Sequence, residues 1–182
     1  MFNGMSEYIP LLGDFIEDVV RNIPSVFLLT PHIAGSSGDT LFASTPRRNY
    51  TISQIPELLA DAGLDEAAAK VRYGLKYAAQ IDKPFPFPTV CAIGTGVDTT
   101  GRLQWTENIV RGTNDGKWTH PSTEVKVDGD GTVPRSSATI ACDVWSKAGG
   151  NVRMLELKGA THIGMMKDKK MFQLIDELAC SN

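Results

Sequence analysis

The sequence predicts an α/β protein in which parallel strands are connected by helices. The run TVCAIGTG at 89–96 is apolar, rich in β-formers and closed by glycines, which is typical of a buried strand. After it, predicted strands and helices alternate to the end of the chain, and this order favours parallel strands with helical crossovers. The residues before it are predicted to be mostly helical.

The first region, residues 1–83, contains three predicted helices. A cap and an apolar face predict the first helix, and a capping box between Thr51 and Gln54 with a stop at Gly63 predicts the second. An extended apolar segment and a segment rich in Gly, Ser, Pro and Thr separate these two, and the latter is predicted to be a loop. The predicted segments are helix 13–23, extended segment 25–31, loop 31–49, helix 51–63 and helix 64–80.

The second region, residues 84–182, opens with the end of a stiff Pro-rich lead-in, KPFPFP. Alternating or continuous apolar patterns then predict strands, and periodic apolar residues predict helices. The predicted strands are 89–96, 123–127 and 151–159, and the predicted helices are 136–150 and 165–181. We expect the two regions to form one domain, because 182 residues are enough for a single well-buried core.

Composition excludes several classes of function. The net charge of −3, without clusters of Lys or Arg, does not fit a nucleic-acid-binding protein. The apolar runs are too short to cross a bilayer, and no signal peptide opens the chain. The three cysteines lack CxxC spacing and the three histidines lie far apart, so we expect neither a metal nor another cofactor.

The segment VKVDGDGTVPRSS raises the question of why two carboxylates, Asp128 and Asp130, stand among glycines after a predicted strand. A solvated turn is one interpretation, and a carboxylate held for chemistry is the other. A calcium loop does not fit, because Val133 and Thr139 occupy positions where an EF-hand needs Gly and Glu. The preceding GTGVDTTG is not a dinucleotide-binding fingerprint, because Thr99 replaces its third glycine.

Asp130 and His162 each follow a predicted strand, with one helix and one strand between them. Functional loops of open α/β sheets gather at the carboxyl ends of the strands, and α/β-hydrolases carry Ser, Asp and His in this chain order. In such a pair the carboxylate fixes the imidazole tautomer, and the other ring nitrogen exchanges a proton with a serine. A histidine after a strand is more often structural or exposed, but the two residues together favour a hydrolase pair.

Several segments resemble the lecithin:cholesterol acyltransferase family, which includes lysosomal phospholipase A2 and the phospholipid:diacylglycerol acyltransferases. The most specific are DGDGTVPRSSATIACDVW and LELKGATHIGMM, and others are FNGMSEYIPLLGD, IPSVFLLTP, LFASTPRRNYT and VCAIGTGVDT. The resemblance covers nearly the whole chain. It implies that Asp130 is the acid and His162 the base of a catalytic triad, with Asp128 shaping the loop.

The nucleophile that the resemblance implies is not evident in this chain. The family carries it in a G-x-S-x-G elbow, and the nearest match here is Ser36 in AGSSG. Poor helix-forming residues follow Ser36, whereas an elbow needs a helix there, so we do not expect it to be the nucleophile. The resemblance therefore implies a partial α/β-hydrolase fold: a cap or lid region over 1–83, and the last strands and helices of a parallel sheet over 84–182.

The resemblance also implies a function, which is lipid acyl transfer or phospholipase activity through a Ser-Asp-His triad. The donor would be a glycerophospholipid and the acceptor a sterol, a diacylglycerol or water, at a membrane or lipoprotein surface. The isolated chain would be inactive without the nucleophile. The alternative is a non-catalytic fragment or pseudoenzyme that binds lipid or a partner protein.

Two further features come with the resemblance. The family has a disulfide at what looks like Cys91 and Cys142, and a strand packed on a helix brings α-carbons close enough for one. The alternative is two buried free thiols; Cys180 is expected to be free in either case. Asn49-Tyr50-Thr51 is a glycosylation sequon where the family pattern has one. Together they imply a secreted or lysosomal setting.

Overall fold

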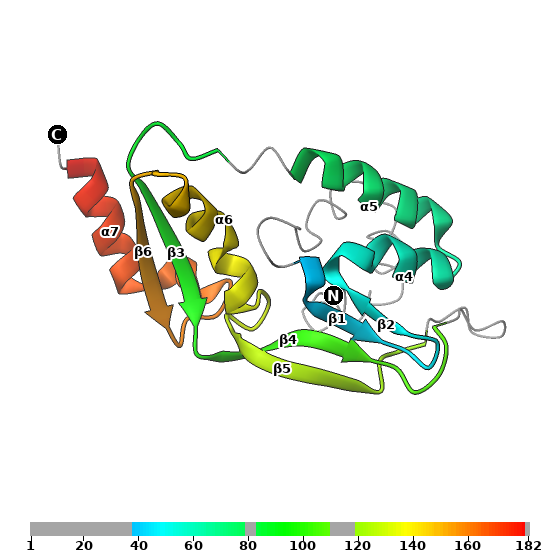
Figure 1. Cartoon of the computed structure of the whole chain (residues 1–182). Coiled ribbons are helices and arrows are strands. Elements are labelled where there is room, and N and C mark those ends of the chain that lie inside the picture. Colours follow the sequence, from blue (N-terminus) through cyan, green and yellow to red (C-terminus); the bar gives the residue numbers. More distant parts are fainter. Residues whose placement is uncertain (1–37, 79–82, 110–118, 181–182) are drawn as a thin grey trace. The chain divides into compact units, whose positions relative to one another are not determined.

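The computed structural model describes residues 38–78, 83–109 and 119–180, and it shows a mixed α/β protein (Figure 1). The predicted helix 13–23, the extended segment 25–31 and Ser36 lie outside the described residues. The chain divides into two compact units, Met1–Ile81 with Arg102–Val125, and Asp82–Gly101 with Lys126–Asn182. Within the described ranges, no helix combines the length and apolar character needed to span a membrane.

In the described part of the first unit, a β-hairpin lies where the sequence predicted a loop, so that prediction was wrong. Strand β1 (Leu41–Ser44) pairs antiparallel with β2 (Asn49–Thr51), and Thr45 and Arg48 close the turn between them. Side chains on both strands are buried, with Ala43 at 0% and Tyr50 at 1% exposure. The turn-forming residues around these short strands hid them, because pairing and burial depend on residues distant in sequence.

Two helices follow the hairpin as the sequence predicted. Each begins later than expected, the first at Ile55 rather than at residue 51 and the second at Asp65 rather than at residue 64. The 3-10 turn η2 (Ile52–Gln54) precedes α4 (Ile55–Asp61), and α5 (Asp65–Ala78) comes next. Thr51 and Gln54 form the expected capping box, in which the backbone N–H of Thr51 donates to Gln54 Oε1 at 3.1 Å. Gly63 ends α4 with φ +78°, a left-handed conformation that glycine adopts without strain. The apolar residues Ile52, Ile55 and Val71 form a buried cluster between these elements.

The second unit is built on a parallel pair of strands, as predicted. Strand β3 (Thr89–Thr95) pairs with β6 (Val152–Lys158) in continuous register from Thr89 opposite Val152 to Thr95 opposite Lys158. Helix α6 (Arg135–Lys147) precedes β6, and η4 (Gly164–Lys167) and α7 (Lys169–Cys180) follow it. The closing helix was expected from residue 165; a 3-10 turn occupies its first residues instead.

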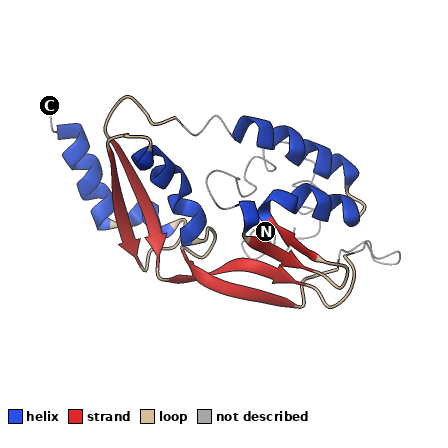
Figure 2. Cartoon of the chain, in the orientation of Figure 1, coloured by secondary structure: helices blue, strands red, loops and turns tan. Residues whose placement is uncertain are grey.

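The two helices cover opposite faces of this strand pair. Glu156 of β6 forms an ion pair with Arg135 of α6, whereas Arg153, on the other face, pairs with Glu177 of α7. Side chains three positions apart on a strand point to opposite faces, so α6 and α7 lie on different sides. Figures 1 and 2 show this arrangement around the β3–β6 pair.

The predicted strand 123–127 exists, but its place in the fold differs from the prediction. It forms β5 (Thr123–Gly129), which neighbours β4 (Val97–Gln104) in a second sheet of order β2-β1-β4-β5 rather than joining the parallel pair. Strand β4 was not predicted, because its residues VDTTGRLQ are polar and contain a glycine. Residues 102–125 group with the first unit, although the sequence-based division placed them in the second region; Leu103 and Gln104 pair with β1.

Candidate active site

Asp130 lies beside the carboxyl end of β3, although 34 residues lie between it and Thr95, the last residue of that strand. Strands β4 and β5 leave the second unit and return, so that Asp130 forms a parallel bridge with Val97, two residues past β3. Gly94 in β3 permits this approach. A Cβ on Gly94 would lie 2.6 Å from the carbonyl oxygen of Ala160 and 2.7 Å from Asp130 Cβ, and real Cβ atoms do not come so close.

The carboxylate of Asp130 is buried and fully engaged. Its Oδ1 accepts hydrogen bonds from the backbone N–H groups of Thr132 at 2.9 Å and Val133 at 2.7 Å. Its Oδ2 lies 2.8 Å from His162 Nδ1, and the residue is only 4% exposed. Burial by itself raises the pKa of Asp130, but the hydrogen bonds from Val133, His162 and Thr132 outweigh it and hold the pKa below its ordinary value. The acid is therefore ionised at neutral pH.

His162 is bound to Asp130 through both its backbone and its side chain. Its backbone N–H donates to the carbonyl oxygen of Asp130 at 2.8 Å, in addition to the contact between the side chains. The loop that carries His162 begins at the end of β6, where the N–H of Gly159 donates to Thr95 O of β3 at 2.6 Å. The side chain of His162 is 49% exposed. A buried acid thus holds a partly exposed imidazole.

Asp128, the other acid of the loop, has different partners. Its Oδ1 accepts the backbone N–H of Gly96 at 2.6 Å, and its Oδ2 lies 3.9 Å from Arg135 Nε. Half of its side chain is exposed. Since Gly96 begins the turn between β3 and β4, Asp128 holds that turn, while the contact with His162 is made by Asp130.

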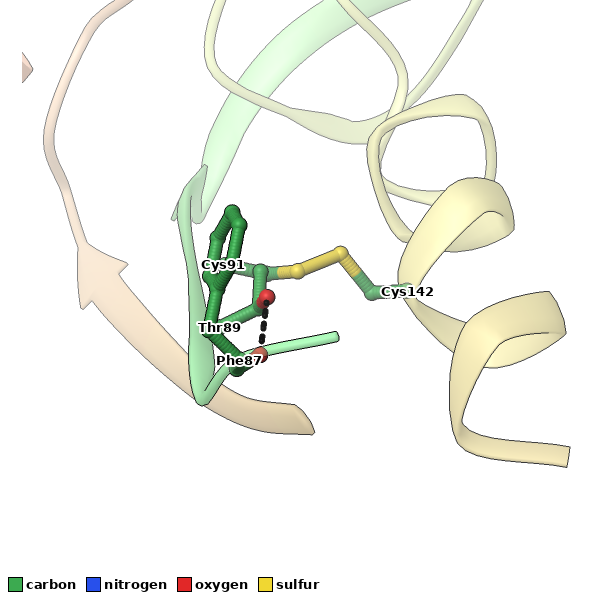
Figure 3. Close-up of a disulfide and its surroundings, with 4 residues drawn as sticks. All are labelled: Phe87, Thr89, Cys91 and Cys142. Atoms are coloured by element: carbon green, nitrogen blue, oxygen red, sulfur yellow. Dashed lines mark hydrogen bonds between the residues drawn. A yellow bond between two sulfur atoms is a disulfide. The ribbon is translucent and has the colours of Figure 1, made fainter. Parts of the chain in front are cut away.

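The structure joins Cys91 of β3 to Cys142 of α6 by a disulfide, with a Cα–Cα distance of 6.5 Å (Figure 3). Both residues are buried. Beside them, Thr89 Oγ1 donates to the carbonyl oxygen of Phe87 at 3.2 Å. Cys180 is free and exposed on α7. The disulfide therefore attaches α6 to β3, and α6 begins only five residues after Asp130.

The remaining candidate residues belong to other parts of the chain. Asn49 is exposed at the start of β2, in the first unit, and Ser36 lies outside the described residues. In the segments that the structure describes, no group of three or more His, Cys, Asp and Glu side chains could hold a metal ion. The sequence analysis did not single out Gly94. It noted Thr99 only because Thr99 replaces a glycine of the dinucleotide-binding motif, whereas its hydroxyl contacts the acid loop. The glycines on both sides of Asp130 are the signal in the sequence that an unusually close backbone approach occurs there.

This geometry supports one kind of chemistry. When a carboxylate accepts the Nδ1 proton of an imidazole, it fixes the tautomer in which Nε2 is unprotonated. Nε2 can then remove a proton from a hydroxyl group, and the carboxylate stabilises the imidazolium that forms. The tautomer is assigned here from this bonding pattern. With this bonding pattern, the pair could act as a general base toward a hydroxyl group placed close to Nε2.

The chain is similar to known proteins over most of its length. The chain is 27% identical over 169 residues to the human lysosomal phospholipase A and acyltransferase, 28% to the rat protein and 27% to the mouse protein. These alignments cover 90% of this chain but only 38% of each relative, so the chain spans well under half of their length. The family model described as lecithin:cholesterol acyltransferase matches residues 24–169, which is more than half of the chain and includes both members of the pair. The chain belongs to the lecithin:cholesterol acyltransferase family.

Proposed function

We propose that this chain supplies the acid and the base of a serine acyl-transfer site that acts on lipids. The observation that carries the proposal is the contact between Asp130 Oδ2 and His162 Nδ1 at 2.8 Å, in which the acid is buried and the imidazole half exposed. Membership of a lipid acyltransferase family supports the choice of chemistry. The first unit would contribute to a cap or lid, and the second would complete an α/β-hydrolase core.

In the proposed reaction, His162 Nε2 takes the proton of a serine hydroxyl as its oxygen attacks the ester carbonyl of a glycerolipid. The ester bond then breaks, and His162 returns the proton to the leaving alcohol, so that the acyl group remains on the serine. In the second half, Nε2 takes a proton from the acceptor as its oxygen attacks the acyl-enzyme, and His162 then gives that proton to the serine oxygen as the acyl–serine ester bond breaks. Asp130 remains ionised throughout and holds Nδ1–H. The serine, in a G-x-S-x-G elbow, and the oxyanion-binding amides would come from sequence that this chain does not contain.

The names of the relatives support a choice of substrate class. Their printed name is that of a phospholipase and acyltransferase, so we propose a glycerophospholipid as acyl donor. Water, a sterol or a diacylglycerol would be the acceptor, and the reaction would take place at a membrane or lipoprotein surface. By itself the 182-residue chain would be inactive, because it would lack the nucleophile.

We further propose a lysosomal or secretory setting. The relatives are named as lysosomal proteins, and the buried Cys91–Cys142 disulfide suits a compartment in which disulfides persist. Asn49 is exposed at the edge of the hairpin, as a glycosylated asparagine must be. A glycan at Asn49 on protein from eukaryotic secretory cells would support this setting.

The experiment joins this chain to an upstream half that contains a G-x-S-x-G elbow and measures release of fatty acid from phospholipid vesicles. Asp130→Asn and His162→Ala should each lower turnover by about 10⁴-fold, because tautomer control and proton transfer are lost. Two matched controls should remain near wild type: Asp128→Asn, whose carboxylate bonds to Gly96, and His120→Ala, whose side chain is exposed.

Each outcome has a definite meaning. Near-normal turnover in Asp130→Asn or His162→Ala would refute the assignment of the pair, and a greater loss in Asp128→Asn would move the acid to that residue. If the joined wild-type protein binds vesicles without hydrolysing or transferring an acyl group, the chain belongs to a non-catalytic lipid-binding protein.

A further inference from the structure

Thr99, the third residue of β4, is a buried polar side chain that the proposed mechanism does not use. It is 1% exposed and ranks among the largest fully buried side chains in the described part of the chain. Its hydroxyl donates to the carbonyl oxygen of Val97 at 2.9 Å and accepts the backbone N–H of Gly131 at 2.8 Å. A hydroxyl has one proton to donate, so its donor capacity is used on Val97.

Both hydrogen-bond partners of Thr99 are backbone neighbours of the proposed acid. Val97 pairs with Asp130 in the parallel bridge, and Gly131 follows Asp130 directly. On the other side of the acid, a Cβ on Gly129 would lie 2.5 Å from Thr99 Oγ1. The hydroxyl of Thr99 therefore contacts the chain immediately before and immediately after Asp130.

This position links Thr99 to the aim of the carboxylate. Gly131 has φ +88°, and the next two backbone N–H groups, from Thr132 and Val133, bind Asp130 Oδ1. With Oδ1 held there, Oδ2 is left for His162. The orientation of the Gly131 peptide thus decides where those two N–H groups point. Gly131 itself is exposed, and its bond to Thr99 restrains the turn on the inner side, while the backbone N–H of Asp130 donates to Val133 O at 3.3 Å across the turn.

We propose that Thr99 is a positioning residue for the acid–histidine pair: its hydroxyl fixes the turn at Gly131, and the turn aims Asp130 Oδ2 at His162 Nδ1. The catalytic part of this inference rests on the proposed function. Its geometric part does not, because the tautomer of His162 can be measured without any reaction. Thr99 touches neither substrate nor the reacting atoms and acts only through Asp130.

The test compares Thr99→Val, which keeps the volume and removes the hydroxyl, with Thr99→Ser, which keeps the hydroxyl. Thr139→Val is the matched control, since Thr139 is a buried threonine that belongs to α6 and not to the acid loop. The first readout is the ¹⁵N chemical shifts of the His162 imidazole in the 182-residue chain. These shifts report which ring nitrogen carries the proton, and the His162→Ala spectrum identifies the signals among the three histidines.

We expect wild type, Thr99→Ser and Thr139→Val to hold the Nδ1–H tautomer, and Thr99→Val to distribute the proton between both nitrogens. In the protein joined to an upstream half that contains a G-x-S-x-G elbow, Thr99→Val should lower kcat about 10- to 100-fold with KM unchanged, because a misplacement of about 1 Å costs up to ~10²-fold. Thr99→Ser should restore kcat to within a few-fold of wild type.

Several results would overturn the proposal. One is a wild-type His162 tautomer in folded Thr99→Val. Another is loss of a dispersed spectrum in both Thr99→Val and Thr99→Ala while Thr99→Ser folds, which would make the hydroxyl a folding requirement only. If the joined wild-type protein shows no turnover, the proposed function fails, and the tautomer measurement still decides the role of Thr99.

Discussion

Reduction of the Cys91–Cys142 disulfide is a perturbation whose effect on stability can be worked out from the structure. The two cysteines are 51 residues apart in sequence. In the chain-entropy description, opening a loop of that length returns about 14 cal/mol/K to the unfolded chain, or about 4 kcal/mol at room temperature. Small domains unfold with only about 5–15 kcal/mol, so this loss is a large part of the total. We therefore expect the reduced chain to be partly unfolded in moderate urea.

The assay compares oxidised and reduced forms of one protein, which keeps every buried atom in place and avoids a cavity. A Cys180→Ser background removes the exposed free thiol, which could otherwise exchange with the disulfide. Urea unfolding followed by circular dichroism gives the unfolding free energy of each form by linear extrapolation. A difference below about 1 kcal/mol would contradict the loop-entropy reasoning. Peptide mapping that finds Cys91 and Cys142 both alkylated, in protein from an oxidising compartment, would remove the bridge itself.

Three further predictions concern the acid, its glycine neighbour and the hairpin. The pKa of Asp130 is lower in the folded state than in the unfolded chain, so its ionised form stabilises the fold above about pH 4, and this contribution is lost as pH falls through the folded pKa. In urea unfolding, Asp130→Asn should be less stable than wild type at pH 6, and the difference in unfolding free energy should shrink toward pH 3. A difference that stays constant over this range would refute the prediction. Gly94→Ala should destabilise the chain by about 1–3 kcal/mol, since its methyl group would overlap Ala160 O and Asp130 Cβ, and an unchanged melting temperature would contradict that contact. Asn49→Gln should remove one glycan from secreted protein, seen as a mobility shift on gels, and identical mobility would show that the sequon is unused.

Local patterns predicted the elements whose signals lie within one segment. The capping box at Thr51 and the left-handed Gly63 mark the ends of the α4 region because each depends on residues within three or four positions. The apolar run of β3 likewise predicted a buried strand, since burial on both faces removes polar residues from the sequence itself. The loop positions of Asp130 and His162 could also be predicted, and the resemblance suggested which acid pairs with the histidine.

Tertiary structure decided the rest, because strand pairing joins residues that are distant in sequence. Strand β4 is polar and contains a glycine, and only its pairing with β1 and β5 makes it a strand. That pairing carries the chain away from β3 and brings Asp130 back to Val97, a contact that no local pattern encodes. Thr99 appeared in the sequence only as the residue that spoils a dinucleotide motif. Its hydroxyl acquires partners at Val97 and Gly131 because two strands and a turn fold together around it.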